Sequence, residues 1–196
     1  MSKRITTDQI GELVAQDKAG RVTRDDLDAF LKNPSRWRDA EIVVNTAPAG
    51  TKTENGFTFK VDYGLTVVQM IAAGRYGWAN DDVTWDNFPH DRTLNKIKIT
   101  AELIHFGRNM STDAVLAELD RRGLRPATMA ELLAFGASFP EEQRKLPIVE
   151  LGSIWTLRCG YRLVGYLHGY GSERFLNLYD VEGGWYDRYR FLAVRK

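Results

Sequence analysis

The sequence predicts an α+β fold, and three observations support this prediction. Residues 96–106 alternate between apolar and polar side chains, which is the pattern of a half-buried strand. Two segments with helix-capping residues and helical apolar spacing follow within residues 111–139. Short apolar runs separated by glycine-rich turns then continue to the C-terminus. Strands and helices that occur in separate runs like these are typical of α+β domains.

Length and charge narrow the classes of protein to consider. A chain of 196 residues fits one large or two small domains. The 27 Lys and Arg residues are scattered among 26 Asp and Glu residues, which leaves a net charge of +1. Nucleic-acid-binding proteins usually carry a basic face, so we do not expect a nucleic-acid partner.

The single cysteine, Cys159, can neither form an internal disulfide nor complete a metal-binding pair. A reducing compartment, and by default the cytoplasm, is therefore expected. The N-terminus carries acidic residues early and no apolar core segment, so it does not resemble a signal peptide. No apolar run reaches the ~18 residues of a membrane helix, and we expect a soluble protein.

The first third of the chain predicts a helical hairpin followed by a small β region. Residues 6–33 contain two helix patterns, which end at Gly20 and Pro34. Residues 41–45 and 57–63 are predicted to be strands, with a turn-rich stretch between them. Thr66 and Gln69 have the spacing of a capping box and predict a short helix that ends at Gly74.

The segment that follows, residues 76–85, is polar and aromatic, and we interpret it as a connector. Asp81, Asp82 and Asp86 lie in or next to it, but their spacing does not match a calcium-binding loop. The sequence therefore predicts no metal site.

The second half begins with the strand over residues 96–106, in which His105 shares a face with apolar residues and is interpreted as a structural histidine. Ser111 is placed to cap the first helix, which Gly123 would end. A capping-box pattern at Thr128 and Glu131 predicts the second helix, with Pro140 beyond its end.

Residues 152–196 have the composition of a binding surface. They contain six of the eight tyrosines, and Gly, Asn, Asp and Ser dominate the other polar positions. Tyrosine provides large rigid contacts at low entropic cost, while Gly, Ser and Asn provide adaptable hydrogen bonds. The alternative is a glycine- and tyrosine-rich meander whose aromatic rings lie partly in the core. Trp155 and Trp185, beside the glycine-rich turns, are interpreted as scaffold residues.

Three stretches resemble a known family: Leu124–Ala137, Pro147–Trp155 and Arg190–Lys196. They are similar to variable proteins of diversity-generating retroelements, whose C-terminal domain has the C-type-lectin-like fold in the form used by formylglycine-generating enzymes. The similarity covers roughly residues 57–196. The resemblance implies that the first and last strands of this domain pair, which would set Lys96–Phe106 beside Tyr189–Arg195.

The resemblance also implies two domains. Residues 1–94 would form an N-terminal helical hairpin plus β region that tethers, oligomerises or buttresses the rest. Residues 95–196 would form a C-type-lectin-like ligand-binding domain. In such systems an error-prone reverse transcriptase rewrites template adenines and so diversifies the 3′ end of the target gene. The surface formed from about residue 156 to residue 189 would then differ between lineages.

Ten residues are candidate variable positions and ligand contacts. Asn codons mutated at their adenines can encode each residue type in this set. The candidates are Thr156, Tyr161, His168, Tyr170, Asn177, Tyr179, Asp180, Tyr186, Asp187 and Tyr189.

The chain departs from the members of the lectin-like group that use a cofactor or perform chemistry. Formylglycine-generating enzymes use two cysteines, whereas Cys159 is alone, and the calcium-binding motifs of sugar-binding lectins are missing. We therefore expect no cofactor, no metal and no catalytic residue. Motifs of serine hydrolases, phosphate-binding loops and zinc proteases do not occur either. A nucleophile and base pair between Cys159 and His168 would require the two to meet in space.

The sequence thus predicts a non-enzymatic protein that binds an unknown protein or surface ligand through a hypervariable C-terminal surface. Two alternatives remain open at this point. One is an enzyme on the same scaffold, in which polar groups would converge in a deep pocket. The other is a structural phage or cell-surface component without a variable site.

Overall fold

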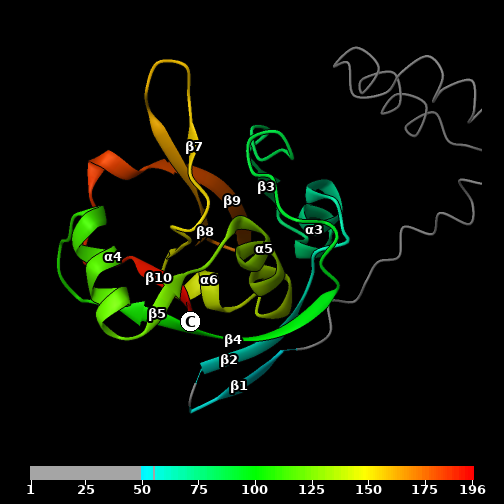
Figure 1. Ribbon diagram of the computed structural model, residues 1–196, viewed down its shortest axis with the longest axis horizontal. Coiled ribbons are helices and arrows are strands. Elements are labelled where there is room, and N and C mark those ends of the chain that lie inside the picture. The colour runs from blue at the N-terminus through cyan, green and yellow to red at the C-terminus, as the bar shows by residue number, and fades with distance from the viewer. Residues whose placement is uncertain (1–49, 55) are drawn as a thin grey trace, which may run out of the picture. The chain divides into compact units, whose positions relative to one another are not determined.

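The computed structural model describes residues 50–54 and 56–196 and contains one mixed sheet with helices on both faces (Figure 1). The predicted helical hairpin and the strand at 41–45 lie outside the described residues. The strands are β1 (Thr51–Thr53), β2 (Gly56–Asp62), β3 (Trp78–Ala79), β4 (Lys96–His105), β5 (Leu124–Pro126), β6 (Ile148–Val149), β7 (Trp155–Thr156), β8 (Arg162–Tyr170), β9 (Glu173–Asp180) and β10 (Arg190–Arg195). The helices are α3 (Val67–Gly74), α4 (Thr112–Arg121), α5 (Met129–Ser138) and α6 (Glu142–Lys145), with a 3-10 turn η1 at Val181–Gly183.

The ten strands are joined in the order β1-β2-β4-β10-β6-β8-β9-β3, with β5 on β10 and β7 on β8. One large sheet with few helices fits the predicted α+β class. The described helices include none that is long and apolar enough to cross a bilayer.

The first and last strands of the second half pair with each other, as the resemblance implied. β10 runs antiparallel to β4, and Leu192 lies opposite Leu103. Arg190 lies opposite His105 at one end of this ladder, and Val194 lies opposite Ala101 at the other. β10 occupies the middle of the sheet, so five of its six residues are buried.

Residues 50–94 share this sheet and its core. β2 pairs antiparallel with β4 in the register Phe59 to Ile99, and β3 pairs parallel with β9. Phe59, Val67 and Met70 are buried in the same apolar cluster as residues of α5. The expected domain boundary after residue 94 therefore falls inside one folded unit, since strands on both sides of it hydrogen-bond together.

The predicted capping residues start the three longer helices. At α3, the Thr66 hydroxyl accepts from the Gln69 backbone and the Gln69 side chain accepts from the Thr66 backbone. Thr128 and Glu131 make the same reciprocal pair at α5, and Ser111 caps α4. These bonds satisfy amide groups that would otherwise lack partners in the first turn of a helix.

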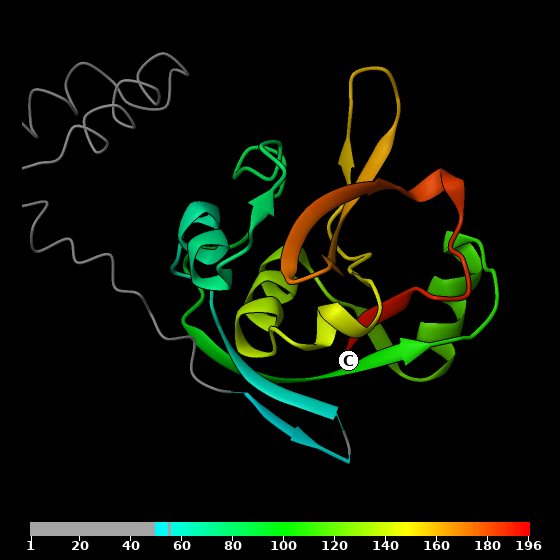
Figure 2. The same cartoon turned by 180° about the vertical axis from the view of Figure 1, so that it is seen from behind.

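Two apolar clusters hold helices on the two faces of the sheet, and Figure 2 shows the arrangement from behind. On one face, α5 packs against β2, β8 and α3, and Leu132 and Leu133 are fully buried. On the other face, α4 contributes Val115 and Leu119 to a cluster that includes Phe191 of β10. α4 covers the part of that face near β10, and β8 and β9 extend beyond this cluster.

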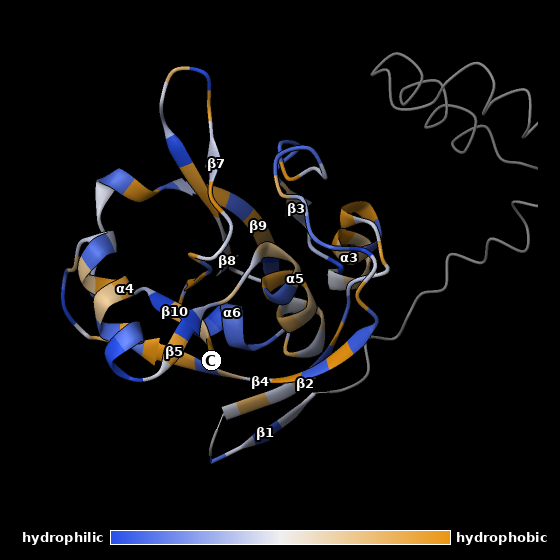
Figure 3. Ribbon diagram, in the orientation of Figure 1, coloured by the Kyte–Doolittle hydropathy of each residue, from blue (hydrophilic) through white to orange (hydrophobic). Residues whose placement is uncertain are grey.

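β8 and β9 form a hairpin that links this covered part of the sheet to its edge. They pair along their full length, from Leu163 opposite Asp180 to Tyr170 opposite Glu173. Gly171, with a φ of +58°, allows the tight turn between them. In Figure 3, hydrophilic and hydrophobic segments follow one another along β9, which is the pattern of a strand with two different faces.

Candidate ligand-binding surface

The outer face of the β8–β9 hairpin carries Tyr166, His168, Phe175, Asn177 and Tyr179, and we call these five residues the β8–β9 face. Successive side chains on a strand alternate between the two faces of a sheet, so residues two apart share a face. Tyr166 lies directly opposite Asn177, and His168 lies directly opposite Phe175. The side chains from β8 and those from β9 therefore meet on one face. All five side chains are half-buried.

His168 lies between two other rings of this face. Its ring centroid is 5.1 Å from that of Tyr166 and 5.0 Å from that of Phe175. The planes differ by only 15° and 14°, so the three rings form one stack. Burial lowers the pKa of His168, and the ring is therefore neutral near pH 7. The stack is a partly accessible, uncharged aromatic group that a ligand can contact.

The aromatic row continues from this stack into the core under α4. Tyr166 contacts Tyr179 with a centroid distance of 5.9 Å, and Tyr179 contacts Trp185 at 5.1 Å and Tyr189 at 5.6 Å. Trp185 is buried, and its Nε1 donates to the Thr112 hydroxyl on α4 over 3.0 Å. The half-buried stack is thus supported at one end by rings that the fold holds in place.

The opposite face of the same hairpin is fixed to the scaffold. Leu167 and Leu176 are fully buried against α5. Arg174 donates from Nη1 to the Gly74 carbonyl over 2.7 Å and from Nη2 to the Gly136 carbonyl over 2.6 Å. These carbonyls lie at the end of α3 and near the end of α5, where a cation also complements the helix dipole.

The Glu150 carboxyl group binds backbone amides of β8 and of the loop that follows β6. One carboxylate oxygen accepts from the Gly165 amide over 3.1 Å, and the other accepts from the Gly152 and Ser153 amides over 2.9 and 2.8 Å. Burial raises the pKa of Glu150 to about 8, although the three amide donors favour the charged form. Ser153 Oγ also accepts from the Met129 amide over 2.9 Å, so the same loop touches the start of α5.

The structure distributes the ten candidate residues over three environments. His168, Asn177 and Tyr179 belong to the β8–β9 face. Five others are exposed and lie in turns or at strand ends: Thr156, Tyr161, Tyr170, Tyr186 and Asp187. Of these, Tyr170 is 82% exposed and projects from the tip of the hairpin.

The remaining two candidates have structural roles. Tyr189 is only 6% exposed and packs between Tyr179 and Trp185, so the expectation that its ring faces a ligand is wrong. The Asp180 carboxylate accepts from the Glu182 amide over 3.0 Å and caps the turn η1. It is only half-buried, but this cap commits one of its oxygens to the fold.

Three aromatic residues of this region were missing from the candidate set. Tyr166 and Phe175 lie on the β8–β9 face, and the two-residue period from His168 and Asn177 would have identified them. Trp78 pairs with Phe175 across β3 and β9, so both project to the same face, and Trp78 is 46% exposed. No sequence pattern connects Trp78 to Phe175, because their pairing joins segments far apart in the chain.

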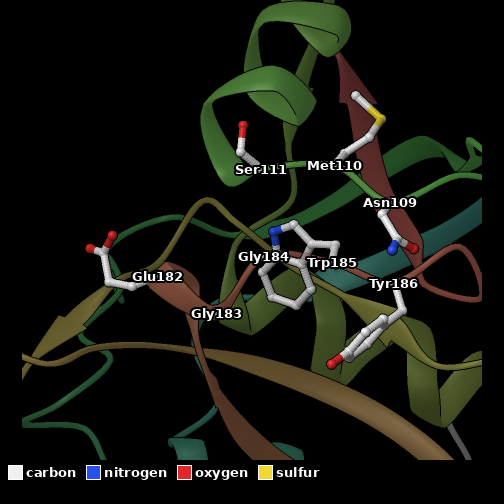
Figure 4. A pocket seen from close by; sticks show the side chains of 8 residues that line it. All are labelled: Asn109, Met110, Ser111, Glu182, Gly183, Gly184, Trp185 and Tyr186. Atoms are coloured by element: carbon white, nitrogen blue, oxygen red, sulfur yellow. The ribbon is translucent and has the colours of Figure 1, made fainter.

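A shallow depression of about 380 Å³ lies near one end of this surface. Figure 4 shows that its lining comes from two segments, Asn109–Ser111 and Glu182–Tyr186. Met110 and Trp185 join these segments through a pair of backbone hydrogen bonds. Tyr186, at 56% exposure, is the most accessible ring at its edge.

The cysteine and histidine pair considered from the sequence is separated by the hairpin geometry. Cys159 is exposed in the turn that joins β7 and β8, which projects from the sheet in Figure 1. His168 lies six residues along β8 from Arg162, a span of about 20 Å for an extended strand. His105 is exposed, and its Nε2 donates to the Asp187 carbonyl over 2.7 Å. Among residues 50–54 and 56–196, no three His, Cys, Asp or Glu side chains gather in a metal-binding arrangement.

Comparisons with protein-family models, with curated proteins and with solved structures found no match.

Proposed function

We propose that the protein is a non-enzymatic binder that recognises a protein or surface ligand through the β8–β9 face, Trp78 and the exposed residues around them. The observation that supports this proposal most strongly is the division of one hairpin into two faces. The inner face is anchored by Arg174 and fully buried leucines, while the outer face presents a stack of partly accessible rings. Large aromatic side chains supported by a rigid frame are typical of the residues that dominate binding energy.

The polar groups of this surface favour binding over catalysis. The His168 stack is uncharged near pH 7, and burial raises the pKa of the Tyr166 and Tyr189 phenols, so these hydroxyls stay protonated. Enzyme sites usually gather polar groups in a concave pocket. Here the aromatic groups lie on a sheet face, and the neighbouring depression is shallow.

We further propose that the surface belongs to a variable protein of a diversity-generating retroelement with a C-type-lectin-like fold. The pairing of β4 with β10, which encloses the helices and the hairpin between the first and last strands, supports this assignment. The exposed candidates Tyr161, Tyr170 and Tyr186 make few contacts that a replacement would disturb, which suits positions that change between lineages.

Sequencing the surroundings of the gene tests the retroelement proposal. We expect a reverse transcriptase gene nearby and an imperfect repeat of the 3′ end that differs from it at adenines. The differing codons should encode exposed and half-buried residues such as Tyr170, Asn177 and Tyr186. A repeat whose differences fall on Leu167, Leu176 and Leu192 would contradict the proposal, because these residues fill the core.

Selection from a library tests the binding proposal separately. His168, Tyr170, Phe175 and Tyr186 would be randomised and the variants selected for binding to a model protein such as lysozyme. We expect folded binders whose affinity falls at least tenfold when Tyr166 or Trp78 is replaced by Ala. A matched replacement at Val68, which is 74% exposed on α3, should leave affinity unchanged. Equal losses at all three positions would exclude a localised surface.

A further inference from the structure

Arg188 places a positive charge beside the aromatic row that starts at the His168 stack. Its guanidinium carbon lies 5.9 Å from the centroid of the Tyr189 ring. The Tyr189 ring in turn lies 6.5 Å from that of Tyr166 and 5.6 Å from that of Tyr179, and both of these residues belong to the β8–β9 face. The charge is therefore one ring beyond the stack, at the end where the β8–β9 face meets the cluster under α4.

The backbone on both sides of Arg188 is held in place. The Asp187 amide donates to Asn109 Oδ1 over 3.0 Å, and the Asp187 carbonyl accepts from His105 Nε2 over 2.7 Å. On the other side, the Tyr189 side chain is buried. The guanidinium thus projects from a segment that is already ordered, so contact with a ligand needs to order only the side chain.

The charge of Arg188 is not compensated within the part of the chain that the structure describes. Arg162 pairs with Glu182 over 2.6 Å, and Arg190 pairs with Glu142 over 3.3 Å. Arg188 is exposed, and none of the described carboxylates lies within ion-pairing distance of it. Its guanidinium is therefore available to an anionic group of a partner.

The surroundings of this charge indicate which anion fits. The β8–β9 face consists of two tyrosines, a phenylalanine, an asparagine and a histidine that is neutral near pH 7, so it adds no second cation. Nucleic acids usually require several cations along their backbone. A guanidinium binds one carboxylate through two parallel hydrogen bonds, and apolar groups that exclude water strengthen such a pair. A single carboxylate next to an apolar group is therefore the ligand chemistry that matches this surface.

We propose that Arg188 is a specificity-determining residue of the ligand surface, and that the partner is a protein segment with a carboxylate two residues from an aromatic or large apolar side chain. Residues two apart in an extended segment project to the same side, about 7 Å from each other. The apolar side chain then packs against Tyr166 and His168 while the carboxylate binds the Arg188 guanidinium. This inference rests on the proposed binding function and names the class of partner.

Two capped tripeptides that differ in one charge test the partner class. In the first, aspartate and phenylalanine flank an alanine, and in the second, asparagine replaces the aspartate. NMR titrations give the affinity of each from the shifts of the Tyr166 and His168 ring signals. For the wild type, we expect the aspartate peptide to bind about tenfold more tightly, because hydrogen bonds between ionised groups are stronger than those to neutral groups. Equal affinities for the two peptides would overturn the proposal.

Three variants assign this preference to one side chain. In Arg188→Gln the ratio of the two affinities should fall to about one, because no cation remains to favour the carboxylate. Arg188→Lys keeps the charge but lacks the planar pair of donors, so it should retain only part of the ratio. Lys98→Gln makes the same change in net charge as Arg188→Gln, but on β4, where Lys98 is exposed opposite Lys60, and it should leave the ratio unchanged. A wild-type ratio in Arg188→Gln would overturn the proposal.

The titrations also separate this inference from the proposed function. If both peptides shift the ring signals with equal affinity, the surface binds ligands but Arg188 does not select them. If neither peptide shifts these signals, the proposed partner class is wrong. The library selection decides independently whether the surface binds a protein.

Discussion

The two faces of the β8–β9 hairpin share one backbone but differ in how their side chains are held. On the inner face, the Arg174 guanidinium is bonded to carbonyls of two helices, and Leu167 and Leu176 are fully buried. On the outer face, the side chains mainly contact one another, as in the stack of Tyr166 and Phe175 on His168. Because residues alternate between the faces, one strand can keep its position while every second side chain remains available for a ligand.

This difference teaches that stability and recognition can be separated residue by residue within a single hairpin. The backbone that carries the outer-face side chains is held by hydrogen bonds from Gln143. Gln143 Nε2 donates to the carbonyl groups of His168 and Phe175 over 2.8 and 3.1 Å, and these bonds do not depend on the identity of either side chain. Replacing the ring of His168 or Phe175 therefore leaves its strand in place.

The largest effect is expected from replacing Arg174 by Met. The change leaves the carbonyls of Gly74 and Gly136 and the Gln143 amide oxygen without their buried donor. We expect the free energy of unfolding to fall by about 3 to 5 kcal/mol in urea denaturation. The matched change on the outer face, Phe175→Ala, should cost about 1 kcal/mol, because it removes one stacked ring. Equal losses would mean that the two faces are held alike.

Tyr189 and Tyr186 offer the same comparison for one residue type. Tyr189 is buried against Trp185, so Tyr189→Ala should lower the free energy of unfolding by about 3 kcal/mol. Tyr186 is exposed, and Tyr186→Ala should change it by less than about 0.5 kcal/mol. Thermal unfolding of the two variants measures both effects. A large loss at Tyr186 would place its ring in the scaffold instead of on the binding surface.

Glu150 predicts how the anchored side responds to pH. Its pKa rises from the ordinary value of 4.5 to about 8 in the folded protein. Between these values the unfolded chain is ionised while the folded protein keeps a proton, so the free energy of unfolding decreases as the pH rises. The slope should approach about −1.4 kcal/mol per pH unit and level off above about pH 8.

Urea denaturation of Glu150→Gln at several pH values isolates this contribution. Glutamine cannot ionise, so the variant should lack this part of the slope. It should also be less stable at every pH, because its amide group places donors against the amides of Gly152, Ser153 or Gly165. A wild type and variant with parallel pH profiles would show that Glu150 stays ionised in the folded protein, stabilised by its three donors.

The sequence predicted those features that depend on neighbouring residues. The capping residues located α3, α4 and α5, and the alternating pattern located β2 and β4. Short elements without a local signal were missed, such as α6 with four residues and no side-chain cap. β3 was interpreted as a connector, because its two residues become a strand only by pairing with β9.

The candidate site was predictable to the same extent. Composition identified the C-terminal tyrosines, but it did not separate exposed Tyr186 from buried Tyr189. These two residues lie at the two ends of one tight turn before β10, so their difference in burial depends on the fold and not on composition. The contribution of Trp78 depends on a strand pairing between distant segments, and a single sequence carries no signal for it. The two-residue period is local, and it would have added Tyr166 and Phe175.

Two randomised libraries on the same hairpin test the separation of the faces most directly. One varies His168, Tyr170, Phe175 and Tyr186, and the other varies Leu163, Leu167, Arg174 and Leu176. Resistance of the displayed variants to protease measures the folded fraction of each library. Our account predicts that most members of the first library remain folded and that few members of the second do. Similar folded fractions in both libraries would contradict it.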